Sequence, residues 1–191
     1  MAVSPSLIAE AVGWRREFHA APELGYQEQE TSRRVAELLA SFGLQVHRGL
    51  AGTGVVATLE NGPGPVIGLR ADMDALPITE LGSVSYRSRR AGVMHACGHD
   101  THIAMLLGAA KLLQEHREEL CGDVRLIFQP AEEHVIGSKA MIAEGALDGV
   151  DAIFGQHVWG TLDIPYIDVT AGPRMAYSGR FTVDVIGTSS H

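Results

Sequence analysis

The sequence predicts an α/β fold in which strands alternate with helices. Short apolar segments rich in β-branched residues alternate with longer segments whose apolar residues recur at helical spacing, and this alternation is typical of the class. The chain has 191 residues, of which 46% are hydrophobic and 20% are charged. A globular protein is therefore expected, with one substantial core, or with one large domain and the start of another.

Two helices are predicted at the start of the chain, over residues 7–19 and 27–42. Residues 55–59 and 66–69 are predicted strands. The Asn-Gly-Pro-Gly sequence at 61–64 is a strong turn signal. These two strands are therefore a candidate β-hairpin.

The alternation continues in the second half of the chain. A helix is predicted over 101–116, and Asp100 is its candidate N-cap. After it come a predicted strand at 124–129, a helix at 138–144, a strand at 152–158 and a strand at 181–186. The last strand has no partner after it, so we expect it to begin an interrupted domain.

Charge and composition exclude some classes of partner. The formal net charge is -8, and the longest basic run is the pair Arg89 and Arg90, so nucleic acid is an improbable partner. The start of the chain lacks a secretory pattern, and no apolar stretch reaches membrane-spanning length. Cys97 and Cys121 form no CxxC pair, and reduced thiols are expected although a disulfide between them remains an alternative. A cytoplasmic protein without a membrane partner is predicted.

Segment 95–102 is the densest cluster of potential metal ligands and supporting groups. It contains His95, Cys97, His99, Asp100 and His102. Thiolate and imidazole suit zinc and related divalent metals, and Gly98 allows the tight turn that brings Cys97 and His99 together. The alternatives are a buried structural cysteine flanked by surface histidines, or a reactive Cys97 thiol assisted by His99 or His95.

Acidic residues follow two of the predicted strands. Glu132 and Glu133 come just after the strand that Pro130 ends. Beside a metal, one such carboxylate binds the cation and the other accepts a proton from water; the alternative is a solvated loop or helix start. Asp74 is a candidate for orienting a metal ligand or the general base, and Asp72 for a structural role, although either acid alone is equally consistent with a turn cap.

Five motifs in this order resemble one family. They are Trp14–Tyr26, Arg70–Pro77, His95–His102, Gln129–Glu133 and Gly155–Val158. Together they resemble the aminoacylase and carboxypeptidase-like dinuclear metallopeptidases, and within them the amidohydrolase branch of hippurate hydrolases, N-acetylamino-acid and N-acetyldiaminopimelate deacetylases and auxin-conjugate hydrolases. The resemblance covers nearly the whole chain.

The resemblance implies a zinc-peptidase-like mixed sheet flanked by helices and a site with two divalent metal ions, zinc or manganese, with nickel or cobalt also possible. It implies that the metal ligands are Cys97, His99, Glu133 and His157. Glu132 is implied as the catalytic base and Asp74 as the acid that orients a ligand. The implied reaction is hydrolysis of the amide bond of small N-acyl amino acids by metal-activated water.

The resemblance also divides the chain. Residues 1–173 correspond to the N-terminal part of the catalytic domain, and residues 174–191 to the start of a lid or dimerisation domain, which makes homodimers in full-length relatives. His191 corresponds to a histidine that helps to stabilise the tetrahedral intermediate. Because the family continues with a further metal-binding histidine, the chain is expected to be truncated, and the alternative function is an inactive remnant that at most binds metal.

Overall fold

The computed structural model describes residues 3–176, 179, 181–188 and 191. The chain divides into two compact units, Met1–Trp159 and Gly160–His191. Every helix and strand found among the described residues belongs to the first unit. No helix in this described part has the length and apolar character that a membrane crossing requires.

The first unit is built on one five-stranded sheet with the strand order β1-β2-β4-β3-β5. The strands are β1 (Gln45–Leu50), β2 (Gly54–Leu59), β3 (Val66–Asp72), β4 (Asp123–Gln129) and β5 (Ala152–Gly155). Strand β2 pairs antiparallel with β1 and with β4, whereas β3 is parallel to β4 and to β5. The predicted α/β class with a mixed sheet is confirmed.

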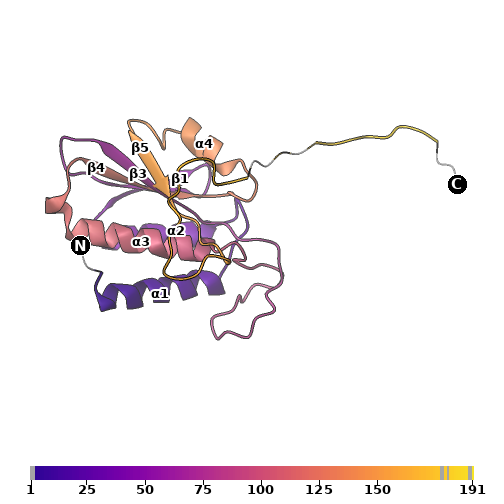
Figure 1. Cartoon of the computed structure of the whole chain (residues 1–191), viewed down its shortest axis with the longest axis horizontal. Coiled ribbons are helices and arrows are strands. Elements are labelled where there is room, and N and C mark those ends of the chain that lie inside the picture. The colour runs from indigo at the N-terminus through magenta and orange to yellow at the C-terminus, as the bar shows by residue number, and fades with distance from the viewer. Residues whose placement is uncertain (1–2, 177–178, 180, 189–190) are drawn as a thin grey trace. The chain divides into compact units, whose positions relative to one another are not determined.

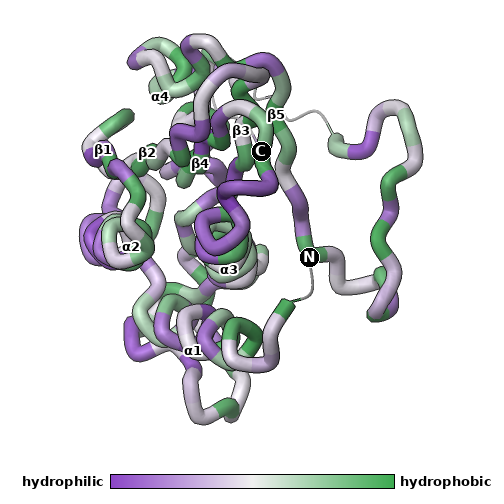
Figure 2. Tube along the Cα trace, turned by 90° about the vertical axis from the view of Figure 1, so that its left-hand side faces the viewer, coloured by the Kyte–Doolittle hydropathy of each residue, from purple (hydrophilic) through white to green (hydrophobic). Residues whose placement is uncertain are grey.

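Helices cover both faces of this sheet (Figures 1 and 2). They are α1 (Pro5–Ala20), α2 (Gln29–Ser41), α3 (His99–Glu115) and α4 (Gly137–Ala143), and a short 3-10 helix spans Arg117–Glu119. Helices α2 and α3 lie against one face, α1 packs on α3, and α4 lies on the opposite face. The four predicted helices are confirmed, with ends that differ by a few residues.

Alternate residues of the central strands enter two separate cores. Val55 and Phe128 belong to the main core beneath α1, α2 and α3. Their neighbours Val56 and Ile127 belong to the smaller core, together with Met141 of α4. This alternation follows from the two-residue period of a strand. Because both faces are covered, β2 is apolar almost throughout, and β4 is apolar and buried over residues 126–128.

The predicted hairpin of residues 55–59 and 66–69 is wrong. Strand β4 lies between β2 and β3, and Ile127 pairs with residues of both strands. The turn after β2 is anchored to the start of β4 instead, since the Asn61 amide N–H donates to Asp123 Oδ1 at 2.8 Å. An apolar strand such as β4 is most stable in the interior of a sheet with both faces covered, which overrides the local turn signal. The hairpin partner of β2 is β1, a largely exposed strand that the sequence pattern did not predict.

Three other local predictions need correction. Asp100 does not cap α3, because Gly98, at φ 85°, takes the N-cap position; Asp100 lies in the first turn and accepts from His19 Nδ1 at 2.8 Å. Strand β5 ends at Gly155, which places His157 in the segment beyond it. The described residues 181–186 form no strand, because a strand requires partner backbone groups that the described part of the second unit does not supply.

The first compact unit ends at Trp159, ahead of the predicted domain boundary at residue 173. The assignment of residues 174–191 to the start of a lid domain stays a prediction. Cys97 and Cys121 are both free thiols, in agreement with the expected reduced state.

We predict that the main core depends on Leu107 of α3, which is 0% exposed. Leu107→Ala removes buried methyl groups and leaves a cavity, so the free energy of unfolding should fall by about 2–5 kcal/mol. Urea denaturation measures this change. The matched control is Met105→Ala on the same helix, where the side chain is 37% exposed. Equal losses in the two variants would contradict the assignment of the core.

Candidate metal centre

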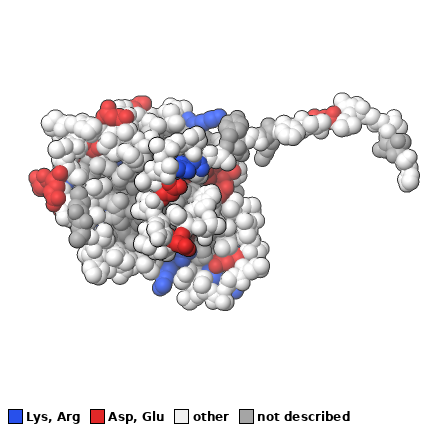
Figure 3. Space-filling view, in the orientation of Figure 1, with Lys and Arg blue, Asp and Glu red and all other residues white. Residues whose placement is uncertain are grey.

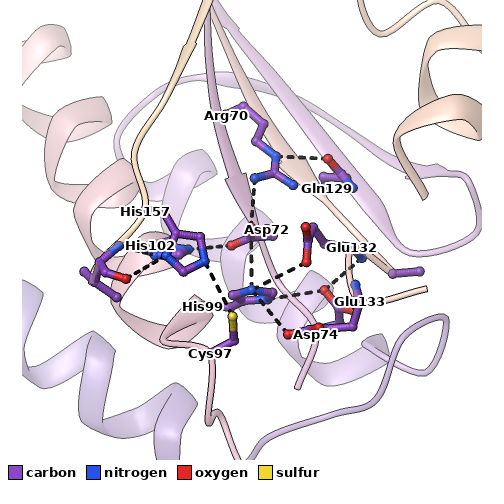
Figure 4. Close-up of polar contacts among 12 residues, drawn as sticks. Arg70, Asp72, Asp74, Cys97, His99, His102, Gln129, Glu132, Glu133 and His157 are labelled. Carbon is purple, nitrogen blue, oxygen red and sulfur yellow. Dashed lines mark hydrogen bonds and ion pairs between the residues drawn. The ribbon is translucent and has the colours of Figure 1, made fainter. Parts of the chain in front are cut away.

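Three parallel strands end at the same edge of the sheet, and the chain beyond each one contributes polar side chains (Figure 4). This edge is where sites form in open α/β sheets. The contributing residues are Asp72 and Asp74 from β3 and its exit, Glu132 and Glu133 after β4, His157 after β5, and Cys97 and His99 around the start of α3.

His99 lies at the centre of these residues and is fully buried. Its Nε2 atom lies 3.6 Å from Asp72 Oδ2, 3.8 Å from Glu132 Oε2 and 3.8 Å from Glu133 Oε1. Its Nδ1 atom lies 3.4 Å from Asp74 Oδ1. Neither ring nitrogen makes a hydrogen bond of normal geometry within the described residues. Such an imidazole, facing three carboxylates with Nε2, has the surroundings of a metal ligand.

Cys97 and His157 lie beside His99. Cys97 Sγ is 3.5 Å from His157 Nε2. His157 Nδ1 is 2.6 Å from the carbonyl oxygen of Val158, and because a carbonyl only accepts, Nδ1 carries the proton. The lone pair of His157 Nε2 therefore faces the Cys97 sulfur, and once the thiol loses its proton the two atoms are placed to bind one cation together.

Among the residues that the structure describes, three groups of donor atoms have metal-binding spacing, and His99 belongs to all of them. They are Cys97, His99 and His157; His99, Glu132 and Glu133; and Asp72, His99 and His102, with the donor atoms of each group within 4.8 Å of one another. The first combines sulfur with imidazole and the second imidazole with carboxylate, a donor set that suits zinc and related ions. A buried Glu133 oxygen also lacks a hydrogen-bond partner within the described residues. The residues fit a divalent metal.

The protonation states of these groups also favour a cation. Burial raises the pKa of the Cys97 thiol to about 12, and the nearby carboxylates add to the effect. Burial and the charge of Asp72 raise the pKa of Glu132. Burial alone would lower the pKa of His99, but the surrounding carboxylates outweigh it and raise this pKa. Cys97 and His99 therefore hold their protons more firmly than usual, and a bound cation would displace these protons.

Residues 68–186 match the model of a family described as Peptidase family M20/M25/M40. The match covers more than half of the chain. This chain belongs to that family.

Similar proteins are known from plants and bacteria. The IAA-amino acid hydrolase ILR1-like 5 of Arabidopsis thaliana is 49% identical over 180 residues, which are 94% of this chain and 41% of the relative. The N-acyl-L-amino acid amidohydrolase of Geobacillus stearothermophilus is 43% identical over 184 residues, 95% of this chain and 50% of the relative. The chain thus spans half or less of the length of these relatives.

The fold agrees with a solved M20 structure. The crystal structure of the Bacillus subtilis YXEP protein, a dinuclear metal-binding peptidase from this family, is similar with a TM-score of 0.80 and 42% identity. The similarity covers 82% of this chain and 44% of that protein. The sheet and helices described above are those of the M20 fold.

The loop that carries Glu132 and Glu133 in this M20 chain is held by two other carboxylates. Asp74 accepts the amide N–H groups of Glu132 and Glu133, each at 3.0 Å. Glu28 accepts the amide N–H of the preceding residue, Ala131, at 2.9 Å, and the Glu28 side chain is completely buried. Three successive amides are thereby satisfied, although Ala131 has the unfavourable φ of 50°.

Glu28 also accepts the Thr53 hydroxyl at 2.7 Å. Burial raises the pKa of Glu28, and the hydrogen bonds from Thr53 and Ala131 partly offset this rise. Nothing in the sequence identified this residue, because its partner Ala131 is 103 residues away.

Asp72 is also more than a local turn residue. Its Oδ2 accepts from Arg70 Nη1 at 2.8 Å, and its Oδ1 lies 2.6 Å from His102 Nδ1. Burial would raise the pKa of Asp72, but the hydrogen bond with His102 and the neighbouring positive groups hold it well below its usual range. Asp72 therefore stays ionised among the candidate ligands.

The six predicted site residues of the first unit are brought together by the fold. They are Asp74, Cys97, His99, Glu132, Glu133 and His157. His95 and Asp100, also in the dense segment, join none of the metal-spaced groups. Burial lowers the pKa of His95 to about 4. His191 belongs to the second unit, and its role stays a prediction.

We predict that Glu28 stabilises the Glu132 loop. Glu28→Ala leaves the buried Ala131 amide without an acceptor, so the free energy of unfolding should fall by about 1–3 kcal/mol and metal affinity should fall with it. Glu28→Gln should recover part of both, because its amide oxygen can accept from Ala131 while the Thr53 hydroxyl turns to accept from the amide nitrogen. Denaturation and metal titration measure the two effects.

The control for Glu28 is Glu30→Ala, which removes an exposed carboxylate from the start of the same helix. Its effect should be small, as is usual for exposed ion pairs. If Glu28→Ala behaved like this control, the loop would not depend on Glu28.

Proposed function

We propose that this chain carries the metal centre of a dinuclear metal-dependent amidohydrolase acting on small N-acyl amino acids. The observation that carries the proposal is buried His99, whose Nε2 lies within 3.8 Å of Asp72, Glu132 and Glu133. The names of the similar proteins support the reaction class: one is an N-acyl-L-amino acid amidohydrolase, and another hydrolyses IAA-amino acids.

The residues proposed to hold two divalent ions are Cys97, His99, Glu133 and His157. Cys97 and His157 form one donor group with His99, and Glu133 belongs to another group around His99, so these residues together would hold the ions. The dinuclear YXEP protein supports this number of ions. Sulfur and imidazole favour zinc, and the carboxylates also accept manganese, nickel or cobalt.

Glu132 is the proposed catalytic base. Its side chain is 40% exposed, so water and substrate can reach it, and burial together with the charge of Asp72 raises its pKa, the direction that favours accepting a proton. Bound divalent ions supply Lewis acidity, which acidifies water and polarises an amide carbonyl. Glu132 then accepts the proton of the attacking water and passes it to the leaving nitrogen.

Asp74 is proposed to orient His99. Its contact with Nδ1 at 3.4 Å favours the tautomer whose Nε2 lone pair faces the carboxylates. Its two hydrogen bonds to the amides of Glu132 and Glu133 fix the base and the ligand in the same frame. His191 is proposed to stabilise charge that develops on the carbonyl oxygen.

A nucleophilic Cys97 is disfavoured. Reactive thiols have a lowered pKa, whereas burial raises that of Cys97 to about 12. Treatment with a metal chelator separates the thiol mechanism from the metal-dependent one, because the activity of a thiol enzyme would survive removal of metal.

We also propose a cellular location, an excluded class of partner and a C-terminal domain for the whole protein. Free thiols at Cys97 and Cys121 support a reducing, cytoplasmic location. The net charge of -8 disfavours nucleic acid, and on the face in Figure 3 basic side chains are scattered among acidic ones. We also propose that residues 174–191 are the start of a lid or dimerisation domain, and that full-length relatives form homodimers through this domain.

We predict different effects for the two neighbouring glutamates. Glu133→Ala should lose bound metal, counted by elemental analysis, because it removes a ligand. Glu132→Gln should keep the metal but lower the hydrolysis of N-acetyl amino acids by about 10²–10⁴-fold, since the base is gone. Metal loss in both variants would contradict the division of roles. Stoichiometric metal without hydrolysis in the unaltered chain would favour the alternative, a metal-binding remnant.

We also predict that metal affinity rises with pH. The Cys97 pKa of about 12 keeps the thiol protonated throughout the neutral range, so metal binding to the thiolate releases a proton. Affinity should increase about tenfold per pH unit for each proton released, and isothermal titration between about pH 6.5 and 8.5 measures it. Cys121→Ser, at an exposed thiol, should leave the slope unchanged. A flat dependence would exclude thiolate ligation.

A further inference from the structure

His102 lies one turn after His99 on α3 and is almost completely buried. Its Nε2 is 2.9 Å from the backbone amide nitrogen of Val158. A backbone amide can only donate, so Nε2 accepts and the ring proton is on Nδ1. That proton is donated to Asp72 Oδ1 at 2.6 Å. Both ring nitrogens of His102 are therefore occupied.

This hydrogen bonding separates His102 from the candidate ligands. One of its ring nitrogens has metal-binding spacing with Asp72 and His99, but the lone pair that a cation needs already accepts the Val158 amide N–H. Within the dense segment 95–102, His102 therefore has a role other than ligation.

The Val158 amide belongs to the segment that carries His157. Strand β5 ends at Gly155, and within the described residues no backbone–backbone hydrogen bond holds positions 157–159. The bond from Val158 to His102 is thus the main polar anchor of this segment. An unanchored ligand segment would lose entropy on metal binding.

Two packing contacts also hold the segment of His157 and Val158 against α3. The His102 ring meets the His157 ring edge-on, with centroids 4.6 Å apart and an interplanar angle of 70°. The Val158 side chain covers Gly98 so closely that a Cβ there would lie 2.4 Å from Val158 Cγ2. The segment is therefore seated on the start of α3, between Cys97 and His102.

We propose that His102 is a positioning residue that clamps the His157 segment onto α3 and thereby aims His157 Nε2 at Cys97. The chain of bonds runs from Asp72 through the His102 ring to the Val158 amide, so it ties the end of β3 to the exit of β5 (Figure 4). One neutral imidazole supplies both the donor and the acceptor. The inference rests on the proposed function in treating His157 as a metal ligand.

The test compares His102→Asn with His102→Gln. The amide nitrogen of Asn can replace Nδ1 as donor to Asp72, but the side chain is too short to accept from Val158. The amide oxygen of Gln can reach the position of Nε2 and accept. Only the Gln variant should therefore keep the clamp, although both variants remain polar and of similar size.

Two readouts are made on the full chain. By amide hydrogen exchange, Val158 should exchange at least about tenfold faster in His102→Asn than in the unaltered chain and in His102→Gln, while the amide of Leu107 in α3 stays protected in all three. In a titration with Co²⁺ alone, the affinity for Co²⁺ should fall about 10–100-fold in His102→Asn and recover in His102→Gln. The thiolate-to-cobalt absorption should weaken in His102→Asn and recover in His102→Gln.

Equal Val158 exchange in the two variants, or rapid exchange in the unaltered chain, would overturn the clamp. Unchanged cobalt absorption in His102→Asn despite faster exchange would overturn its positioning of His157. If the unaltered chain bound no cobalt, the proposed function would fail, and the positioning of a ligand would fail with it. The exchange data would still test, independently of metal binding, whether His102 holds the Val158 segment.

Discussion

The parallel alignment of β3, β4 and β5 is the constraint on which the site depends. These strands end at one edge, so chain segments that are far apart in sequence leave the sheet side by side. The position of β4 beside β3 is essential, because it brings Glu132 and Glu133 next to the acids that follow β3. A hairpin of β2 and β3 would have separated these groups.

The segments that follow β4 and β5 need new hydrogen-bond partners. Their backbone amides no longer pair with a neighbouring strand, and they are at least partly buried. Side chains satisfy them: Glu28 and Asp74 accept the amides after β4, and His102 accepts the amide of Val158 after β5. The groups that satisfy the backbone also fix the orientation of the candidate ligands. Local stability and site geometry are therefore coupled.

Electrostatics explains why this arrangement suits a cation. Asp72, Asp74, Glu132 and Glu133 surround one buried imidazole, and the Cys97 thiol is held protonated. Arg70 offsets part of this negative charge through Asp72. The remainder is best balanced by metal ions, which replace protons without requiring the acids to move apart.

The sequence by itself determined the α/β class and the four helices, because helical periodicity is a local property. It supplied the candidate site residues through motifs that resemble a known family. It did not determine the strand order, the exposed strand β1 or the exit of β5 before His157, since pairing depends on which apolar strand becomes central. It also gave no role to Glu28 and left that of His102 open. Their proposed roles rest on hydrogen bonds to Ala131 and Val158, and partners so distant in the chain are brought together only by the tertiary structure.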